Sequence, residues 1–414
     1  MSDGRRYLSL DFAGGDQSSG AHNARWIHPR VEAHLLPGNA VQLLCDGEET
    51  LPAMFAAIRR ARRCVHLEFY VFEEVRCAGE KLSELLVKRR AAGVQIAVIY
   101  DAVGSAHTAP TFLETLQRAG VQLLKFNPLN PLDAGRNWSP NRRDHRKILI
   151  VDGTVAIVGG VNLSSWYESA ASRRAAAAER GRAIGCRWRD TDLLLRGPAV
   201  AQLQQLFLEH WEEQRGDPLQ EAGFCPLPGR SGQEYVGILG SAPACGRPSY
   251  YNALLAALRS ASSRVWITAG YFLPTAEQIA VLIGAARRRV DVQLVLPSHN
   301  DSTAALAVQR FGYAELLKAG VQIYEREGVI LHAKTVIVDD SWSAVGSSNF
   351  DRRSVRFNDE VDVVVVGART AKALARLFLA DIREARRIEA AAWRRRPWLQ
   401  RAREWFWKPW ENLL

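Results

Sequence analysis

Cysteine is scarce in this sequence, and long apolar runs are missing from it. Its 414 residues include six cysteines, none of which forms a CxxC pair or stands in a Cys/His cluster with zinc spacing. No uninterrupted apolar run reaches the roughly 18 residues of a membrane-spanning helix, and the N-terminal residues lack the apolar core of a signal peptide. These absences argue against a disulfide-stapled, zinc-stabilised or membrane-spanning protein. They favour a reducing cytoplasm, in solution or at a membrane surface.

Acidic residues are also in the minority, 44 against 54 lysines and arginines, which gives a net charge of +10. Such a charge favours anionic partners, either nucleic acid or acidic lipid, although an arginine-rich solvated surface has the same composition. With 47% hydrophobic and 24% charged residues, the chain is typical of globular proteins, and its length suits two domains.

The most informative feature is an internal repeat. The stretch HRKILIVDGTVAIVGGVN at residues 145–162 returns as HAKTVIVDDSWSAVGSSN at 332–349. The surroundings repeat as well, since VHLEFYVF resembles VWITAGYF and TLQRAGVQLLKF resembles ELLKAGVQIYER. In each half, apolar runs of strand length alternate with amphipathic segments of helix length.

This alternation predicts an α/β fold with two domains related by a pseudo-twofold axis. Each domain is expected to be a mostly parallel or mixed sheet with helices on both faces. The expected order is an N-terminal tail (1–38), a first repeat (39–214), a Gly/Pro-rich linker (215–235), a second repeat (236–385) and a C-terminal segment (386–414). The symmetry would bring the two motif copies to one cleft.

Each motif copy predicts a β-hairpin. The Asp-Gly pair between two β-branched runs is a strong hairpin signal, with strands near 145–151 and 154–158. Residues two apart on a strand face the same way, so His145 and Lys147 project together, with His332 and Lys334 as their counterparts. A single HxK on a hairpin is most often a surface histidine and lysine on an edge strand. Two copies with the same spacing indicate a function, because the fold itself needs no histidine or lysine at these positions.

Two imidazoles, two ammonium groups and two amides around one cleft suit a phosphodiester. The lysines, Asn162 and Asn349 are predicted to hold the non-bridging oxygens and to stabilise charge on five-coordinate phosphorus. Gly159 and Gly160 are expected to let the backbone approach the ligand. One histidine would attack phosphorus, and the other would protonate the leaving alcohol and deprotonate the acceptor. The sequence shows no convincing carboxylate cluster for Mg²⁺ or Zn²⁺, so we expect neither a metal nor a cofactor.

A nucleophilic imidazole needs an acceptor for its second nitrogen. Asp190 and Glu360 stand at equivalent places, each at the start of a strand, and are predicted to orient the histidines within or across the halves. Asp192 and Asp362, two residues further on, form a second equivalent pair. The alternative for any of these four acids is that it only caps or solvates the end of a strand. Asp152 and Asp339 complete the motif and are counted with the catalytic residues, although turn chemistry also accounts for them.

Both copies resemble the HxKxxxxD motif of the phospholipase D superfamily, whose members pair two such halves around one active site. The resemblance covers roughly residues 40–380. The stretches HLEFYVF, FNPLNPL, AIVGGVNLSSWY, RWRDTDLLLRGPAV and AGYFLPT resemble bacterial cardiolipin synthases, in the short form without N-terminal membrane-spanning helices.

The resemblance implies transfer of a phosphatidyl group through phosphohistidine to a hydroxyl of phosphatidylglycerol. The donor would be phosphatidylglycerol or, as in some short members, phosphatidylethanolamine. It also implies that His145 is the nucleophile and His332 the acid and base, an order that the symmetric residues alone leave open.

The C-terminal segment is rich in tryptophan and arginine. WRRRPWLQRAREWFWKPWENLL at 393–414 predicts an amphipathic helix that begins near Pro397. Its aromatic residues Trp398, Trp405, Phe406 and Trp410 are predicted to contact an anionic membrane surface. A terminal helix packed on the protein's own surface is the alternative. With a lipid substrate, a peripheral position on the cytoplasmic face of the bacterial inner membrane is expected.

The sequence therefore predicts a phospholipase D-type phosphatidyltransferase that makes cardiolipin. Two alternatives keep the two-histidine site: a phospholipase D-type hydrolase and a metal-independent nuclease. No basic-aromatic strand platform for a nuclease stands out, so no nucleic-acid partner is expected. A non-catalytic lipid-binding protein is a third alternative, and the two intact motifs argue against it.

Overall fold

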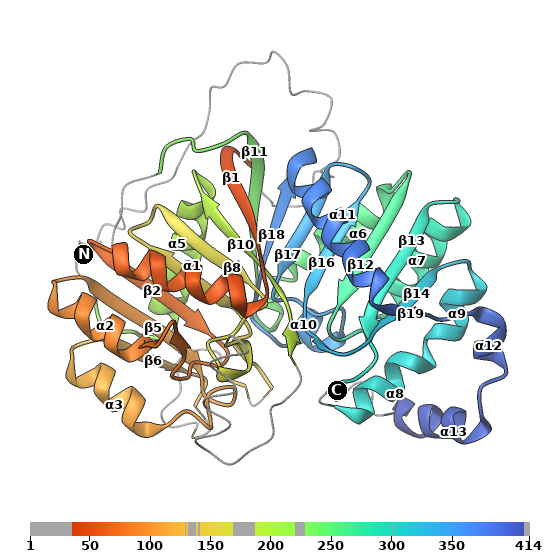
Figure 1. Cartoon of the computed structure of the whole chain (residues 1–414), viewed down its shortest axis with the longest axis horizontal. Coiled ribbons are helices and arrows are strands. Elements are labelled where there is room, and N and C mark those ends of the chain that lie inside the picture. The colour runs from red at the N-terminus through yellow and green to blue at the C-terminus, as the bar shows by residue number, and fades with distance from the viewer. Residues whose placement is uncertain are drawn as a thin grey trace, which may run out of the picture.

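The computed structural model describes residues 35–128, 130, 138–139, 141–168, 187–219, 228–300 and 302–409. Within them, one large sheet runs through both repeats (Figure 1), in the strand order β19-β14-β13-β12-β16-β17-β18-β11-β1-β10-β8-β7-β2-β5-β6. The first repeat supplies β1 (Leu36–Cys45), β2 (Cys64–Phe69), β5 (Gln95–Asp101), β6 (Gln122–Phe126), β7 (Lys147–Val151), β8 (Val155–Gly159) and β10 (Thr191–Arg196). The second supplies β11 (Glu234–Ser241), β12 (Arg264–Ala269), β13 (Asp291–Pro297), β14 (Gln322–Arg326), β16 (Lys334–Val338), β17 (Trp342–Gly346), β18 (Glu360–Val366) and β19 (Ala385–Arg387).

The strand order is the same in both directions from the centre of this sheet. There β1 pairs antiparallel with β11. The strands β10, β8, β7, β2, β5 and β6 then follow on one side, and β18, β17, β16, β12, β13 and β14 follow on the other. The pseudo-twofold repeat is thus confirmed, and the two halves share a single continuous sheet.

The sheet is mixed, as predicted, but it is not mostly parallel. Parallel pairing is confined to β2–β5–β6 and β12–β13–β14. The motif hairpins β7–β8 and β16–β17 pair antiparallel with their neighbours on both sides. A strand buried on both faces is apolar along its whole length whichever way its neighbour runs, so the apolar runs could not distinguish the two arrangements.

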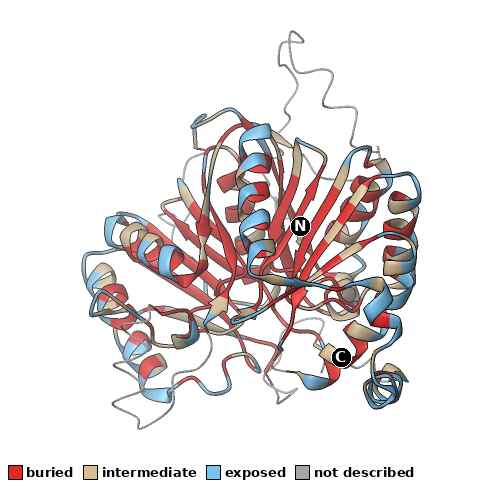
Figure 2. Cartoon of the chain, turned by 45° about the vertical axis from the view of Figure 1, so that its right-hand side comes forward, coloured by how far each residue is buried: buried red, intermediate tan, exposed pale blue. Residues whose placement is uncertain are grey.

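Helices cover both faces of the sheet, and their outer sides are exposed (Figure 2). One face packs against α1 (Asp46–Arg60), α2 (Leu82–Ala91) and α3 (Pro110–Arg118) in the first repeat, and against α6 (Ser249–Ser260), α7 (Ala276–Arg287) and α9 (Tyr313–Lys318) in the second. On the other face, α5 (Ala199–Glu213) and α11 (Ala368–Arg383) bury Phe207 and Phe378 in one core that spans both repeats. This common core ties the halves together.

The remaining elements lie outside the large sheet. They are the short pairs β3 (Arg76–Cys77) with β4 (Glu80–Lys81) and β9 (Trp188–Arg189) with β15 (Ile330–Leu331), the 3-10 turns η3 (Ser165–Tyr167) and η5 (Pro243–Cys245), and the helices α8 (Thr303–Phe311), α10 (Arg352–Arg356), α12 (Ala390–Arg394) and α13 (Trp398–Trp407). No helix among the described residues combines the length and apolar character required to cross a bilayer. Residues 1–34 of the expected tail and 220–227 of the expected linker lie outside the described residues.

Candidate active site

The two motif copies form the predicted hairpins, β7–β8 and β16–β17. Lys147 pairs with Phe69 of β2, and Lys334 pairs with Ala269 of β12. Each histidine therefore lies just before its hairpin, at the end of the sheet where the parallel strands finish. Asp152 and Asp339 occupy the hairpin turns with φ angles of 52° and 53°, a conformation that aspartate tolerates better than most residues.

The pseudo-twofold axis brings the two histidines together. The ring centroids of His145 and His332 lie 6.4 Å apart with an interplanar angle of 76°. Both side chains are almost completely buried. At this separation both rings reach one tetrahedral phosphorus placed between them, as the shared-site prediction requires.

Each histidine is held by a carboxylate from the opposite repeat. His145 Nδ1 lies 2.9 Å from Glu360 Oε2, and His332 Nδ1 lies 2.7 Å from Asp190 Oδ2. Both carboxylates are fully buried. Because Nδ1 donates its proton to the carboxylate, the lone pair of the imidazole falls on Nε2, which is the nitrogen available for chemistry.

Backbone pairing between the repeats explains this crosswise arrangement. His145 N–H donates to Asp359 O, directly before Glu360, over 2.8 Å. His332 N–H donates to Arg189 O, directly before Asp190, over the same distance. The chain that leads into each motif thus runs beside the carboxylate strand of the other repeat, and this fixes which acid each histidine meets.

Hydroxyl groups complete the two carboxylate sites. Tyr167 OH donates to Asp190 Oδ2 over 3.0 Å, and it lies 3.1 Å from His332 Nδ1. On the other side, Ser347 Oγ and Ser354 Oγ donate to Glu360 over 2.5 and 2.7 Å. Tyr167 and Ser354 occupy equivalent positions, five residues after the asparagine of each motif. Sequence reasoning missed both, although a hydroxyl residue at the same offset in each copy is a usable signal.

The motif glycines face these carboxylates. A Cβ atom at Gly160 would lie 2.0 Å from Asp190 Oδ1, and one at Gly346 would lie 2.2 Å from Asp362 Oδ1. The close approach that Gly159 and Gly160 allow is one between strands, and a contact of their backbone with a ligand stays a prediction. The glycines let the hairpin strand pack closely on the strand that carries the acids.

The two lysines are buried beside the histidines, and each ammonium donates to the carbonyl oxygen of its own motif histidine. Burial lowers the pKa of Lys147 to about 7 and that of Lys334 to about 8, although nearby carboxylates oppose the shift. An anionic ligand would restore the full positive charge of both groups. Buried lysines with lowered pKa values are expected in a site that binds a phosphate group.

The ionisation of the four central groups follows from the same surroundings. Burial and the Lys334 charge lower the pKa of His332 to about 3, and burial also lowers the pKa of His145. Burial alone would raise the pKa of Glu360, but its interaction and hydrogen bond with His145 and the Lys147 charge lower it to about 2. For Asp190, the interaction and hydrogen bond with His332 and the Lys334 charge likewise outweigh burial and lower the pKa. The free site therefore holds neutral imidazoles on ionised carboxylates.

The asparagines lie beside this group. Asn162 is buried, and its Oδ1 accepts from Val71 N–H over 3.2 Å, so its NH₂ group remains a donor. Asn349 is half-buried, and its backbone N–H donates to Ser354 Oγ over 3.1 Å. Both positions suit the predicted contact with phosphate oxygens, which stays a prediction.

The two motif aspartates are placed elsewhere. Asp152 accepts hydrogen bonds from the backbone N–H groups of Arg62, Arg63 and Cys64. Asp339 accepts from the equivalent groups of residues 262–264. At about 3.3 Å per strand residue, each lies roughly 20 Å from its motif histidine. This geometry contradicts the prediction that they are catalytic, because their carboxylates hold the turn onto the start of β2 or β12.

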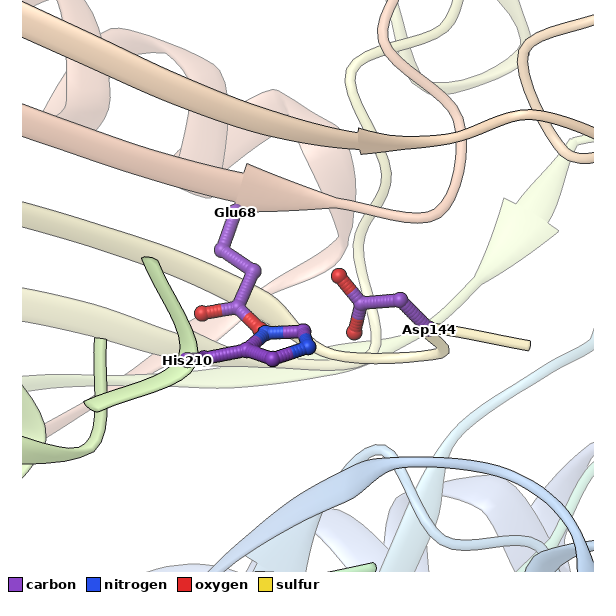
Figure 3. Close-up of side chains that lie close together, drawn as sticks. All are labelled: Glu68, Asp144 and His210. Carbon is purple, nitrogen blue, oxygen red and sulfur yellow. The ribbon is translucent and has the colours of Figure 1, made fainter. Parts of the chain in front are cut away.

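A second buried cluster lies next to His145. Glu68, Asp144 and His210 have one potential ligand atom each within 4.8 Å of the others, a spacing found nowhere else among the described His, Cys, Asp and Glu residues (Figure 3). The Arg146 guanidinium donates to Glu68 over 3.1 Å and supplies positive charge. Burial raises the pKa of Glu68 to about 7 and that of Asp144 well above its usual range. A shared proton therefore suits the cluster better than a metal ion.

Three of the four predicted membrane residues lie on α13, at the lower right of Figure 1. Trp398, Trp405 and Phe406 are strongly exposed there. Trp410 lies outside the described residues. Their membrane contact stays a prediction.

Comparisons with known proteins agree with this architecture. Residues 54–172 and 254–382 match the family described as "Cardiolipin synthase, PLD-like domain". A cardiolipin synthase of Geobacillus kaustophilus (strain HTA426) is 33% identical over 365 residues, which are 87% of this chain and 70% of that protein. Cardiolipin synthase A of Pseudomonas entomophila (strain L48) is 35% identical over 361 residues, 86% of this chain and 71% of that one.

The fold also occurs in a solved structure. The crystal structure of a phosphatidylserine synthase from Haemophilus influenzae Rd KW20 superposes with a TM-score of 0.67 over 95% of this chain and 100% of that one. Its sequence is only 12% identical, so it shows the common fold alone. The family match and the curated relatives carry the assignment further: the chain belongs to the cardiolipin synthase family of phospholipase D-like proteins.

Proposed function

We propose that this phosphatidyltransferase makes cardiolipin through a phosphohistidine intermediate. The proposed phosphatidyl donor is phosphatidylglycerol, and the alternative donor is phosphatidylethanolamine. The acceptor is a hydroxyl group of a phosphatidylglycerol molecule. Family membership supports the reaction. The observation that carries the mechanism is the pair of histidines, 6.4 Å apart, each oriented by a carboxylate of the opposite repeat.

In the first step, His145 Nε2 attacks the phosphorus of the donor. A P–N bond forms, and the P–O bond to the headgroup alcohol breaks. His332 gives its Nε2 proton to the leaving oxygen, so that free glycerol departs when phosphatidylglycerol is the donor. Glu360 stabilises the imidazolium that develops on His145, because its carboxylate accepts the Nδ1 proton.

In the second step, a hydroxyl of the acceptor phosphatidylglycerol attacks the same phosphorus. His332 takes the hydroxyl proton, the P–N bond breaks, and cardiolipin leaves with His145 neutral again. Throughout, Lys147 and Lys334 stabilise the negative charge on the non-bridging oxygens, with Asn162 and Asn349 as neutral donors.

His332 has to be protonated for the first step, whereas it is neutral in the free site. A bound phosphodiester would raise the pKa of His332, because its negative charge lies beside the imidazole ring and offsets the Lys334 charge. Substrate binding and protonation of His332 are thus coupled. The enzyme takes up the proton when the donor lipid binds.

The test uses phosphatidylglycerol dispersed in detergent and mass spectrometry of the products. The expected products are cardiolipin and glycerol, with phosphorus label on His145 after a brief reaction and an alkaline quench. His145→Ala and His332→Ala should each lose at least about 10⁴-fold in rate while remaining folded. Phosphatidic acid as the sole product would make the protein a hydrolase, and full turnover by either variant would refute the shared site.

We also propose that the enzyme acts at a membrane surface, where both lipid substrates reside. Its partners are then the phospholipids themselves and an anionic bilayer, with the inner membrane of a bacterium as the expected location. The exposed aromatic residues of the C-terminal helix support this proposal.

A further inference from the structure

The C-terminal helix α13 has its apolar side turned outward. The four most exposed large apolar side chains among the described residues all lie on it: Trp398 (72%), Leu399 (64%), Trp405 (72%) and Phe406 (60%). The one fully buried side chain of the helix is Glu404. A surface helix normally buries its apolar stripe and exposes its charges, so this helix presents the reverse of the usual arrangement.

Polar and mixed contacts hold the inner side of α13 in place. Glu404 accepts from Arg396 over 2.6 Å, in an ion pair that is almost completely buried. The Arg396 guanidinium also lies 4.6 Å from the ring centre of Trp393, which packs in the core of the second repeat. Trp407 packs against a small apolar cluster with Leu273. The helix is therefore fixed to the protein without using its outer aromatic side.

Positive charge surrounds the outer side. Arg394, Arg395, Arg401 and Arg403 are all exposed and flank the aromatic residues. Exposed tryptophan and phenylalanine bordered by arginine match the interface of an anionic bilayer, with indoles at the headgroup level and guanidinium groups on the lipid phosphates. A second copy of the same patch is a poorer partner, because its arginines would face arginines.

The helix α13 lies at the same end of the strands as the active site. Gly270, directly after β12, contacts His332, since a Cβ at Gly270 would lie 2.7 Å from His332 Cα. The next residues, Tyr271 and Leu273, pack with Trp407 of α13. On the other side of the site, Trp166 is 52% exposed and precedes Tyr167, which contacts Asp190 and His332. In the first repeat an exposed tryptophan is thus adjacent in sequence to a residue of the site, and in the second repeat α13 is anchored at Leu273, three residues after Gly270.

We propose that the outer side of α13 (Trp398, Leu399, Trp405 and Phe406 with Arg401 and Arg403) is a docking surface for anionic phospholipid bilayers. Together with Trp166 it holds the catalytic edge of the sheet against the membrane, where donor and acceptor lipids enter without leaving it completely. This inference extends the proposed function, since it names the surface that delivers the substrates to the histidines.

The test compares binding to vesicles with turnover of dispersed lipid. Trp398→Ser/Trp405→Ser/Phe406→Ser should weaken sedimentation with vesicles of equal phosphatidylglycerol and phosphatidylcholine on the order of a hundredfold. Arg401→Gln/Arg403→Gln should weaken it by about fivefold per charge, with a smaller dependence on salt. Activity on phosphatidylglycerol in detergent micelles should stay within about twofold of the wild type for all these variants.

Leu379→Ser is the matched control, because Leu379 is an exposed apolar residue (41%) on α11. It should bind vesicles like the wild type. Trp405→Glu adds a second check, since a charge at an exposed position leaves the fold intact while repelling the bilayer. Wild-type vesicle binding by the triple variant and by Trp405→Glu would overturn the docking surface. Wild-type protein that binds vesicles but makes no cardiolipin in micelles would instead overturn the proposed function.

Discussion

The imidazole of His332 donates to Asp190, a residue of the other repeat, over 2.7 Å. The same relationship joins His145 to Glu360 in the opposite direction. Neither repeat contains a histidine and its orienting acid together. The catalytic pair therefore depends on the contact between the repeats.

Removing the charge of an orienting acid should impair catalysis without unfolding the protein. Asp190→Asn is expected to lower kcat by about 10²–10⁴-fold, because His332 loses both its fixed tautomer and the charge that stabilises its protonated form. Asp192→Asn is the control. Burial and the Asp190 charge raise the pKa of Asp192 to about 8, so it is already neutral at pH 7. Steady-state kinetics in micelles measure the activity of both variants, and circular dichroism checks that they are folded. An equal loss of activity in both would contradict the role of Asp190 as the orienting acid of His332.

The alkaline limit of activity should come from the lysines. Each buried lysine carries its charge below its lowered pKa, about 7 for Lys147 and about 8 for Lys334, and loses it above. We therefore expect kcat/KM to fall as the pH rises through these values. The pKa values of both histidines are shifted downward, so the need for a protonated His332 adds a steady slope to the profile but no bend near pH 7–8. A profile for Lys334→Met should lack the component near pH 8, and an unchanged profile would assign the limit to another group.

A methyl group at Gly160 should misplace Asp190. The new Cβ would lie 2.0 Å from Asp190 Oδ1, so the carboxylate or the hairpin has to move. Displacements of about 1 Å in an active site lower rates on the order of 100-fold, and we expect a loss of this size for Gly160→Ala. Gly284→Ala on α7, where a Cβ meets only Arg288 at 3.7 Å, should be as active as the wild type. Comparable losses in both would show a general effect on folding.

Asp152 should matter for stability and little for turnover. Asp152→Ala removes the acceptor of three backbone N–H groups and places alanine at a φ of 52°. We expect a loss of about 2–3 kcal/mol in the free energy of unfolding by urea. Asp152→Asn keeps an acceptor and tolerates this φ, so its loss should be about 1 kcal/mol. A large fall in the specific activity of the folded protein would restore a catalytic role for Asp152.

Much of the site was predictable because it depends on repetition. The doubled HxK, the turn aspartates Asp152 and Asp339 and the equivalent acids Asp190 and Glu360 stand at matching positions. The pseudo-twofold axis then brings the histidines and the acids together. These features are local or symmetric, and local patterns survive in a sequence read without coordinates. The α/β class followed from the alternation of strand-length and helix-length runs.

The remainder depends on lengths and on packing that no alignment of the halves displays. The shorter Asp190 is met by the long side chain of Tyr167, whereas the longer Glu360 is met by the short Ser354 at the equivalent position. Because the residue types differ, a search for identical residues passes over them. The direction of the strands was equally hidden, and for α13 the pattern left two alternatives, a membrane surface or the protein's own surface, because it shows that a residue is apolar and leaves open what covers it.

The central pairing of β1 with β11 has one more consequence. The sheet is continuous at this pairing, and each catalytic histidine is oriented by an acid of the other repeat. Separating the two repeats would therefore inactivate both histidines together. Neither repeat can therefore be removed or replaced without depriving the histidine of the other repeat of its orienting acid.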